Sequence, residues 1–237
     1  MPRTLGHHPA FGGPVNMDAL EVSDVPDEQV AATIDLMSRY VREDAGSDEI
    51  KRDARLLGQV YQPTTEDETV QAVHSFVQDR IHFRTDTETS EMATESAAPD
   101  AWTPVAEILI RPRDMAVMCE TGGCLKAGDC DDYSMYAAAL LKALGIRSSF
   151  VTLAAGPQDP TAYSHVDVAA YTSDGRRIPL DASHGRQAGW EVVNRFGTRK
   201  EWPVEGRIAL VLTFIALGLA CWWLLNTEDA RRLLWES

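Results

Sequence analysis

Apolar residues recur at helical spacing in three stretches of the N-terminal half of this 237-residue chain. After Asp27 they fall at Val30, Ile34, Met37 and Val41, three or four positions apart, which predicts a helix with one buried face. The same spacing predicts two more helices, beginning near residues 47 and 65. Their apolar positions are Ile50, Ala54 and Leu57 in the first, and Val70, Val73, Val77 and Ile81 in the second.

The starts of these two helices carry capping signals. Ser47 precedes two acids, Asp48 and Glu49, which favour the positive end of a helix dipole. Thr65 and Glu68 have the spacing of a capping box, in which each side chain accepts the other residue's backbone N–H. Both helix starts are therefore predicted from short-range chemistry as well as from periodicity.

A fourth helix is predicted to follow Asp129. Asp129 can cap it, Asp131 and Asp132 fall in its first turn, and Gly145 ends it where a left-handed residue is favoured. Its predicted buried face comprises Tyr133, Tyr136, Ala137, Leu140, Leu141 and Leu144. Cys130 is thus placed at the N-terminus of a helix whose remainder enters the core.

Three β-rich stretches follow, at residues 148–155, 163–171 and 177–183. Asp174 and Gly175 lie between the second and third, which predicts a β-hairpin. Alternation along the second strand places His165 and Asp167 on one face and Val166 on the other. A shorter apolar run at residues 106–112 fits a strand or a helix.

Residues 208–225 contain no charged side chain and are apolar on every face. As a helix they would span about 27 Å, close to the hydrocarbon thickness of a bilayer, with Trp222 and Trp223 at the far end. We expect a membrane span, with a helix buried in the core or against a partner as the alternative. Basic residues number four just before it and two after it, which favours a cytoplasmic N-terminal part.

The domain prediction follows from these patterns. Residues 1–23 are expected to form an extended arm, 24–200 a single domain, 205–227 the membrane-associated helix and 228–237 a short polar tail. The net charge of −14 argues against a nucleic-acid partner, which would require clustered Lys and Arg. Four cysteines are too few for a disulfide-stapled scaffold, and the N-terminus lacks a signal-peptide run, so a reducing compartment is expected.

The candidate chemistry centres on Cys130. Unpaired N–H groups and the dipole at a helix N-terminus favour thiolate, the nucleophilic form of cysteine. His165 on one strand and Asp181 on the next can meet, because neighbouring strands lie about 4.8 Å apart. The three residues supply a nucleophile, a base and a group that orients the base. His184 is a competing base, and the three aspartates around Cys130 oppose thiolate formation.

The residues GDCDDYSMYAAALLKALGI, SHVDV and IPLDAS resemble the core of the transglutaminase-like cysteine enzymes, a branch of the papain-like fold. Gly128, Cys130 and Asp132 match the family's nucleophile motif, His165 its base and Asp181 its orienting acid. The resemblance covers about half of the chain, residues 65–184. It implies an α+β fold in which the nucleophile helix packs on an antiparallel sheet. The hydrophobic helix expected from the apolar run at 208–225 would follow this core.

The chain is also similar, more loosely, to transglutaminase-like proteins encoded by phages and prophages, through EILIRPRDM and IPLDASHG. Two departures from the family stand out. Val166 follows the histidine where an aromatic residue is common, and only the backbone N–H of Cys130 is assigned as an oxyanion donor. Cys119 and Cys124 could form a zinc site with further ligands, a disulfide, or a pair of separate loop thiols.

Two functional hypotheses follow. The first is thiol-dependent acyl transfer to water or an amine from an amide in a protein or peptide substrate, without a cofactor or metal. Hydrolysis is preferred, because the chain has neither an amine-acceptor domain nor a calcium-loop motif. The alternative is a non-catalytic structural or assembly protein, such as a phage virion component, that keeps the fold. The expected location is membrane-associated through residues 208–225, or within a virion.

Overall fold

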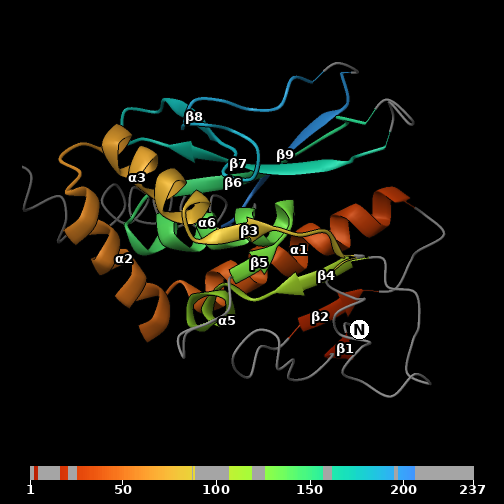
Figure 1. Ribbon diagram of the computed structural model, residues 1–237. Coiled ribbons are helices and arrows are strands. Elements are labelled where there is room, and N and C mark those ends of the chain that lie inside the picture. The colour runs from red at the N-terminus through yellow and green to blue at the C-terminus, as the bar shows by residue number, and fades with distance from the viewer. Residues whose placement is uncertain are drawn as a thin grey trace, which may run out of the picture. The chain divides into compact units, whose positions relative to one another are not determined.

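A four-stranded antiparallel sheet with the order β8-β7-β6-β9 forms one layer of the fold (Figure 1). Its strands are β6 (Arg147–Leu153), β7 (His165–Tyr171), β8 (Arg177–Leu180) and β9 (Arg199–Pro203). The computed structural model describes residues 3–4, 17–20, 26–86, 88, 107–118, 126–156, 162–194 and 197–205. The predicted hairpin is confirmed, since β7 and β8 pair and Gly175 takes a φ of 86° in the connection. Strand β9 was not predicted.

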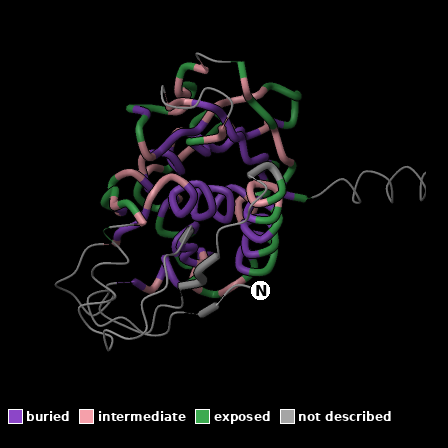
Figure 2. The backbone as a smooth tube through the Cα atoms, turned by 90° about the vertical axis from the view of Figure 1, so that its right-hand side faces the viewer, coloured by how far each residue is buried: buried purple, intermediate pink, exposed green. Residues whose placement is uncertain are grey.

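Helix α6 (Cys130–Ala143) packs on this sheet and lies at the centre of the core. Helices α1 (Pro26–Asp44), α2 (Asp48–Tyr61) and α3 (Glu66–Gln78) contact it from other sides. Every residue of α6 from Asp131 to Leu141 is buried, so the helix is enclosed on all faces rather than on the single face predicted (Figure 2). Gly145, with a φ of 80°, follows its end as predicted.

The capping signals form as expected. Ser47 accepts a hydrogen bond from the N–H of Ile50 at 3.3 Å. Thr65 and Glu68 form the complete capping box, with both side chain-to-backbone distances at 3.2 Å. These contacts fix the entry points of α2 and α3, and with them the frame around α6.

Smaller strands attach the rest of the described chain. Strand β3 (Ile81–Phe83) pairs in parallel with β5 (Lys126–Gly128). Strands β1 (Arg3–Thr4), β2 (Met17–Leu20) and β4 (Glu107–Ile110) form a second antiparallel sheet, and the short helix α5 (Pro112–Val117) follows β4. The run at 106–112 is therefore a strand that ends where a helix begins. The predicted arm contributes two strands: β2 pairs with β4, and β1 pairs with the other edge of β2. No local sequence pattern predicts these pairings.

The described chain confirms the coarse fold class, a mixed α/β architecture of helices and an antiparallel sheet. Among the described residues, no helix has the length and apolar content needed to cross a bilayer. The predicted hydrophobic helix at residues 208–225 lies outside the described part of the chain, as do Cys119 and Cys124.

Candidate functional site

Cys130 is the first residue of α6, and one residue, Asp129, connects it to the end of strand β5. Gly128, the last residue of β5, lies opposite Phe83 in the parallel pairing with β3, and its carbonyl accepts the N–H of Arg84 at 2.9 Å. The first N–H groups of a helix have no intrahelical acceptor and carry the positive end of the dipole. The fold therefore delivers a partly buried thiol to a site that favours negative charge.

Gly128 and Asp132 fix the start of α6. A Cβ at Gly128 would lie 2.5 Å from Oδ2 of Asp132, far inside contact distance, so the position requires glycine. The other carboxylate oxygen of Asp132 accepts the N–H of Ile110 at 2.7 Å, which ties the helix to β4. The sequence motif around the cysteine is thus a packing device that holds the first turn in place.

Of the acids around the thiol, Asp131 and Asp132 lie in the first turn of α6 as predicted, but Asp129 does not cap the helix with its side chain. Asp129 occupies the N-cap position, but its side chain makes no capping hydrogen bond. Asp131 takes over this role locally, since its Oδ1 accepts the N–H of Asp132 at 2.7 Å. The carboxylates of Asp131 and Asp132 are buried, at 3% and 2% exposure. The hydrogen bond that each of these two carboxylates accepts from a backbone N–H offsets part of its charge.

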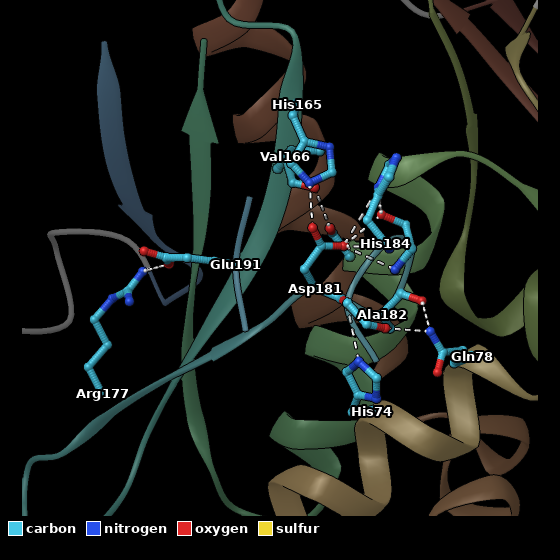
Figure 3. A network of polar contacts seen from close by, with 12 residues as sticks. His74, Gln78, His165, Val166, Arg177, Asp181, Ala182, His184 and Glu191 are labelled. Carbon is cyan, nitrogen blue, oxygen red and sulfur yellow. Dashed lines mark hydrogen bonds and ion pairs between the residues drawn. The ribbon is translucent and has the colours of Figure 1, made fainter. Parts of the chain in front are cut away.

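His165 and Asp181 are in direct contact. His165 begins β7, and Asp181 follows the last residue of β8, one position beyond the Val168–Leu180 pair. Nε2 of His165 lies 2.8 Å from Oδ2 of Asp181, and both residues are buried (Figure 3). An ionised carboxylate only accepts hydrogen bonds, so Nε2 carries the proton and Nδ1 is left as the basic nitrogen.

Asp181 is held as a carboxylate by its other oxygen. Oδ1 accepts the N–H and hydroxyl of Ser183, at 3.1 and 2.8 Å, and the N–H of His184 at 3.0 Å. Burial raises the pKa of Asp181, but the hydrogen bonds from His165, Ser183 and His184 outweigh it, and the net pKa is lowered. The acid is therefore ionised and oriented at neutral pH.

Two residues of α3 hold the backbone behind this acid, and the sequence reading did not identify them. His74 is fully buried, and its Nε2 lies 3.2 Å from the carbonyl oxygen of Asp181. Gln78 donates to the carbonyl oxygens of Gly185 at 2.6 Å and Ala182 at 3.4 Å (Figure 3). A histidine on an otherwise apolar helix face, four positions before a glutamine, was the available signal.

His184 lies beside the pair, in the turn that follows β8 and Asp181. Its ring stands at 88° to that of His165, with centroids 4.9 Å apart, and Phe83 packs on it at 5.4 Å. Its Nδ1 is 2.8 Å from the hydroxyl of Ser183 and 3.9 Å from Oδ1 of Asp181. Burial lowers the pKa of His184, which favours its neutral form.

A cavity of about 390 Å³ brings Cys130 and His165 to one surface. Ser134, one turn into α6, donates to the carbonyl oxygen of Val166 at 3.2 Å, so the first turn of the helix lies against the start of β7. The opposite wall is formed by α1, mainly through apolar side chains. The cavity is lined by Gln29, Val30, Thr33, Ile34, Met37, Asp129, Cys130, Asp131, Thr152, Tyr163, Ser164, His165 and Val166.

Asp167 is a further buried acid next to the pair. It precedes Val168, whose β8 partner Leu180 precedes Asp181. Asp167 is 1% exposed, and neither of its oxygens has a hydrogen-bond partner among the described residues. Burial raises its pKa to about 8, with smaller contributions from Asp181 and Glu191, while two arginines, Arg177 and Arg199, oppose the rise. Asp167 is therefore neutral at pH 7.

No family model matches the sequence, and no curated protein matches it. Solved structures similar to the chain include a TGase, at 15% identity, covering 74% of this chain and 37% of that one, with a TM-score of 0.34. A Cytophaga hutchinsonii protein provisionally assigned as a cysteine protease shows 16% identity, coverages of 79% and 61%, and a TM-score of 0.36.

A third similar structure is Rad4–Rad23 bound to a 6-4 photoproduct UV lesion, at 11% identity, with coverages of 73% and 44% and a TM-score of 0.38. This chain therefore covers between 37% and 61% of the length of these similar chains. Such values assign neither a family nor an activity, so the functional inference depends on the geometry of the site.

Proposed function

We propose that the protein is a thiol-dependent amide hydrolase in which Cys130 is the nucleophile, His165 the base and Asp181 the group that orients the base. The supporting observation is the 2.8 Å contact between His165 Nε2 and Asp181 Oδ2 on the wall of a cavity that Cys130 also lines. Each residue then has a role set by its position. The resemblance of the motifs to transglutaminase-like cysteine enzymes agrees with this assignment.

Acylation begins with proton transfer from the Cys130 thiol to Nδ1 of His165. The sulfur attacks the carbonyl carbon of the substrate, and the carbonyl π electrons move to oxygen, which the backbone N–H of Cys130 can stabilise. The proton on Nδ1 then passes to the amide nitrogen as the C–N bond breaks. The products of this half-reaction are a thioester on Cys130 and a released amine.

Deacylation returns the enzyme to its starting state. Water attacks the thioester and gives one proton to Nδ1 of His165, and the C–S bond breaks to release a carboxylic acid. Throughout both steps Asp181 keeps the proton on Nε2 and stabilises the imidazolium when it forms. The same thioester would yield a transamidated product if an amine replaced water.

The cavity favours a peptide-like acyl chain with an apolar group. Val30, Ile34 and Met37 of α1 line the same cavity as Cys130 and His165, and Thr33 offers a hydroxyl for a main-chain amide. An apolar pocket with a few polar groups is the usual composition of a small-ligand site. No metal or cofactor has a role in this reaction.

The experiment that tests this function is active-site labelling with a peptide that carries an electrophilic carbonyl. Wild-type protein should form one covalent adduct on the peptide containing Cys130, and Cys130→Ala should form none while it still unfolds cooperatively, with only a small shift of the unfolding midpoint. Adducts on the other cysteines only, or none at all, would refute the enzymatic function. The structural or assembly hypothesis would then take its place.

A further inference from the structure

We propose that His165, Asp181 and His184 form a binding site for Zn²⁺, and that the bound ion switches off His165 as a base. The inhibitory part of the proposal rests on the proposed function, but the binding part does not. The sequence pattern indicates no metal at these three residues, and it offers His184 only as a rival base.

The three side chains already have the separation that a metal site needs. One ligand atom from each lies within 4.8 Å of the other two. Zinc bonds of about 2.0–2.1 Å to nitrogen and oxygen place neighbouring ligand atoms of a tetrahedral site roughly 3.3 Å apart. Oδ1 of Asp181 already accepts three hydrogen bonds, which leaves Oδ2 as the ligand oxygen. Oδ2 lies 2.8 Å from Nε2 of His165, so a bound ion would separate these two atoms slightly.

The donor set favours zinc over the common hard cations. Two imidazoles and one carboxylate suit borderline ions such as Zn²⁺, whereas Mg²⁺ and Ca²⁺ prefer oxygen ligands alone. Three protein ligands with an open fourth position is the arrangement of zinc sites that hold a water. His165, Asp181 and His184 provide two nitrogens and one oxygen within 4.8 Å of one another, which leaves the fourth ligand to water.

The surrounding contacts hold the ligands as metal sites require. Ser183 places its hydroxyl 2.8 Å from Oδ1 of Asp181, the oxygen that would not bind the ion, and so orients the carboxylate. His74 and Gln78 hold the backbone of the same segment. Outer contacts of this kind commonly change metal affinity by about 10- to 100-fold when they are removed.

The site also has an entrance. His165 and Asp181 are buried, with side-chain exposures of 5% and 1%, but the side chain of His184 is 48% exposed. An ion can therefore bind His184 from solvent and reach the two buried ligands behind it. This exposure separates His184 from a core histidine and gives the site a side that faces water.

Zinc would inhibit the reaction through the tautomer of His165. Coordination needs the lone pair on Nε2, so the proton that Nε2 donates to Asp181 must leave it and, through solvent, reach Nδ1. With Nδ1 protonated, the ring cannot accept the thiol proton of Cys130. The ion thus replaces the Nε2 proton between His165 and Asp181, and no electron transfer or further reactant is involved.

The test measures Zn²⁺ binding by competition with a chromophoric chelator, using the full chain with Cys130→Ala to remove the nearby thiol. We expect one Zn²⁺ per chain at this site. Adding His184→Ala should weaken zinc binding by at least tenfold. The matched control is His82→Ala, which removes an exposed histidine of β3 that is not in the cluster and should leave binding unchanged.

Cobalt separates this site from thiol sites elsewhere in the chain. Co²⁺ bound to nitrogen and oxygen should give visible d–d bands without the near-ultraviolet charge-transfer band of thiolate ligands, and His184→Ala should abolish those d–d bands. Equal zinc affinity in the His184 and His82 variants, a thiolate spectrum, or no stoichiometric binding would each overturn the proposal. Because no turnover is measured, such a failure leaves the acyl-transfer function to its own labelling test.

Discussion

Asp181→Asn should nearly abolish acylation while it leaves the fold intact. Oδ1 of Asp181 accepts three hydrogen bonds, two from Ser183 and one from His184. In the variant the amide oxygen must take this position, because an NH₂ group there would face three donors. The NH₂ group therefore occupies the place of Oδ2, 2.8 Å from Nε2 of His165.

That NH₂ group can only donate, so Nε2 must accept and the proton moves to Nδ1. Nδ1 is the nitrogen that has to receive the thiol proton, and the base is lost. The corresponding change in the best-studied triad enzyme costs about 10⁴ in rate, which is about 5 kcal/mol of transition-state stabilisation. We expect a loss of that order in the rate of acyl-enzyme formation, measured in single-turnover experiments.

Asp167→Asn is the matched control for this change. It makes the same substitution at a buried acid one position before the Val168–Leu180 pair, and it touches no ring nitrogen of His165 in any described contact. Because the raised pKa of about 8 keeps Asp167 neutral at pH 7, the amide changes no charge there. Its acylation rate should stay within about tenfold of wild type. If Asp181→Asn also stays within tenfold, the tautomer argument is refuted.

Three further predictions concern the nucleophile, the buried acid and the C-terminal segment. Cys130→Ala should eliminate the acyl-enzyme and cost about 1 kcal/mol or less of stability, seen as an unchanged circular dichroism spectrum and a small shift of the melting temperature. The raised pKa of Asp167 means that the folded state holds a proton that the unfolded chain loses, so stability should fall as pH rises. Between pH 5 and pH 7 the wild-type protein should lose about 3 kcal/mol of unfolding free energy, and Asp167→Asn should not show this loss. Urea unfolding in EDTA measures it, and the same pH dependence in both proteins would contradict the prediction. Ending the chain at Glu205 should leave a cooperatively unfolding protein, because the described core ends at Val204; loss of cooperativity would place residues 208–225 in the core.

Local chemistry was enough to predict the elements that carry the site. The capping box at Thr65 and Glu68, the glycine that ends α6 and the β7–β8 hairpin each depend on residues within a few positions of one another. Such signals act before tertiary structure exists, so a single sequence contains them. The alternation along β7 also placed His165 and Asp167 on one face, as the register with β8 requires.

Contacts between distant segments could not be predicted in this way. The parallel pair β3–β5 and the polar edge strand β9 depend on partners that are far away in sequence. His74 contacts the carbonyl oxygen of Asp181, 107 positions away in sequence, and no local pattern in either segment predicts this contact. Asp129 had the residue type of a cap, but Asp131 was close enough to take the first-turn N–H in its place.

The most direct test of the account is the pH dependence of Cys130 alkylation by iodoacetamide, followed by mass spectrometry of the peptide that contains it. If Cys130, His165 and Asp181 act as one unit, the alkylation profile should have an apparent pKa well below the value of about 8.5 for an isolated thiol. His165→Ala should return the profile toward that value. Ordinary thiol reactivity in wild-type protein, with no change in the His165 variant, would contradict the account.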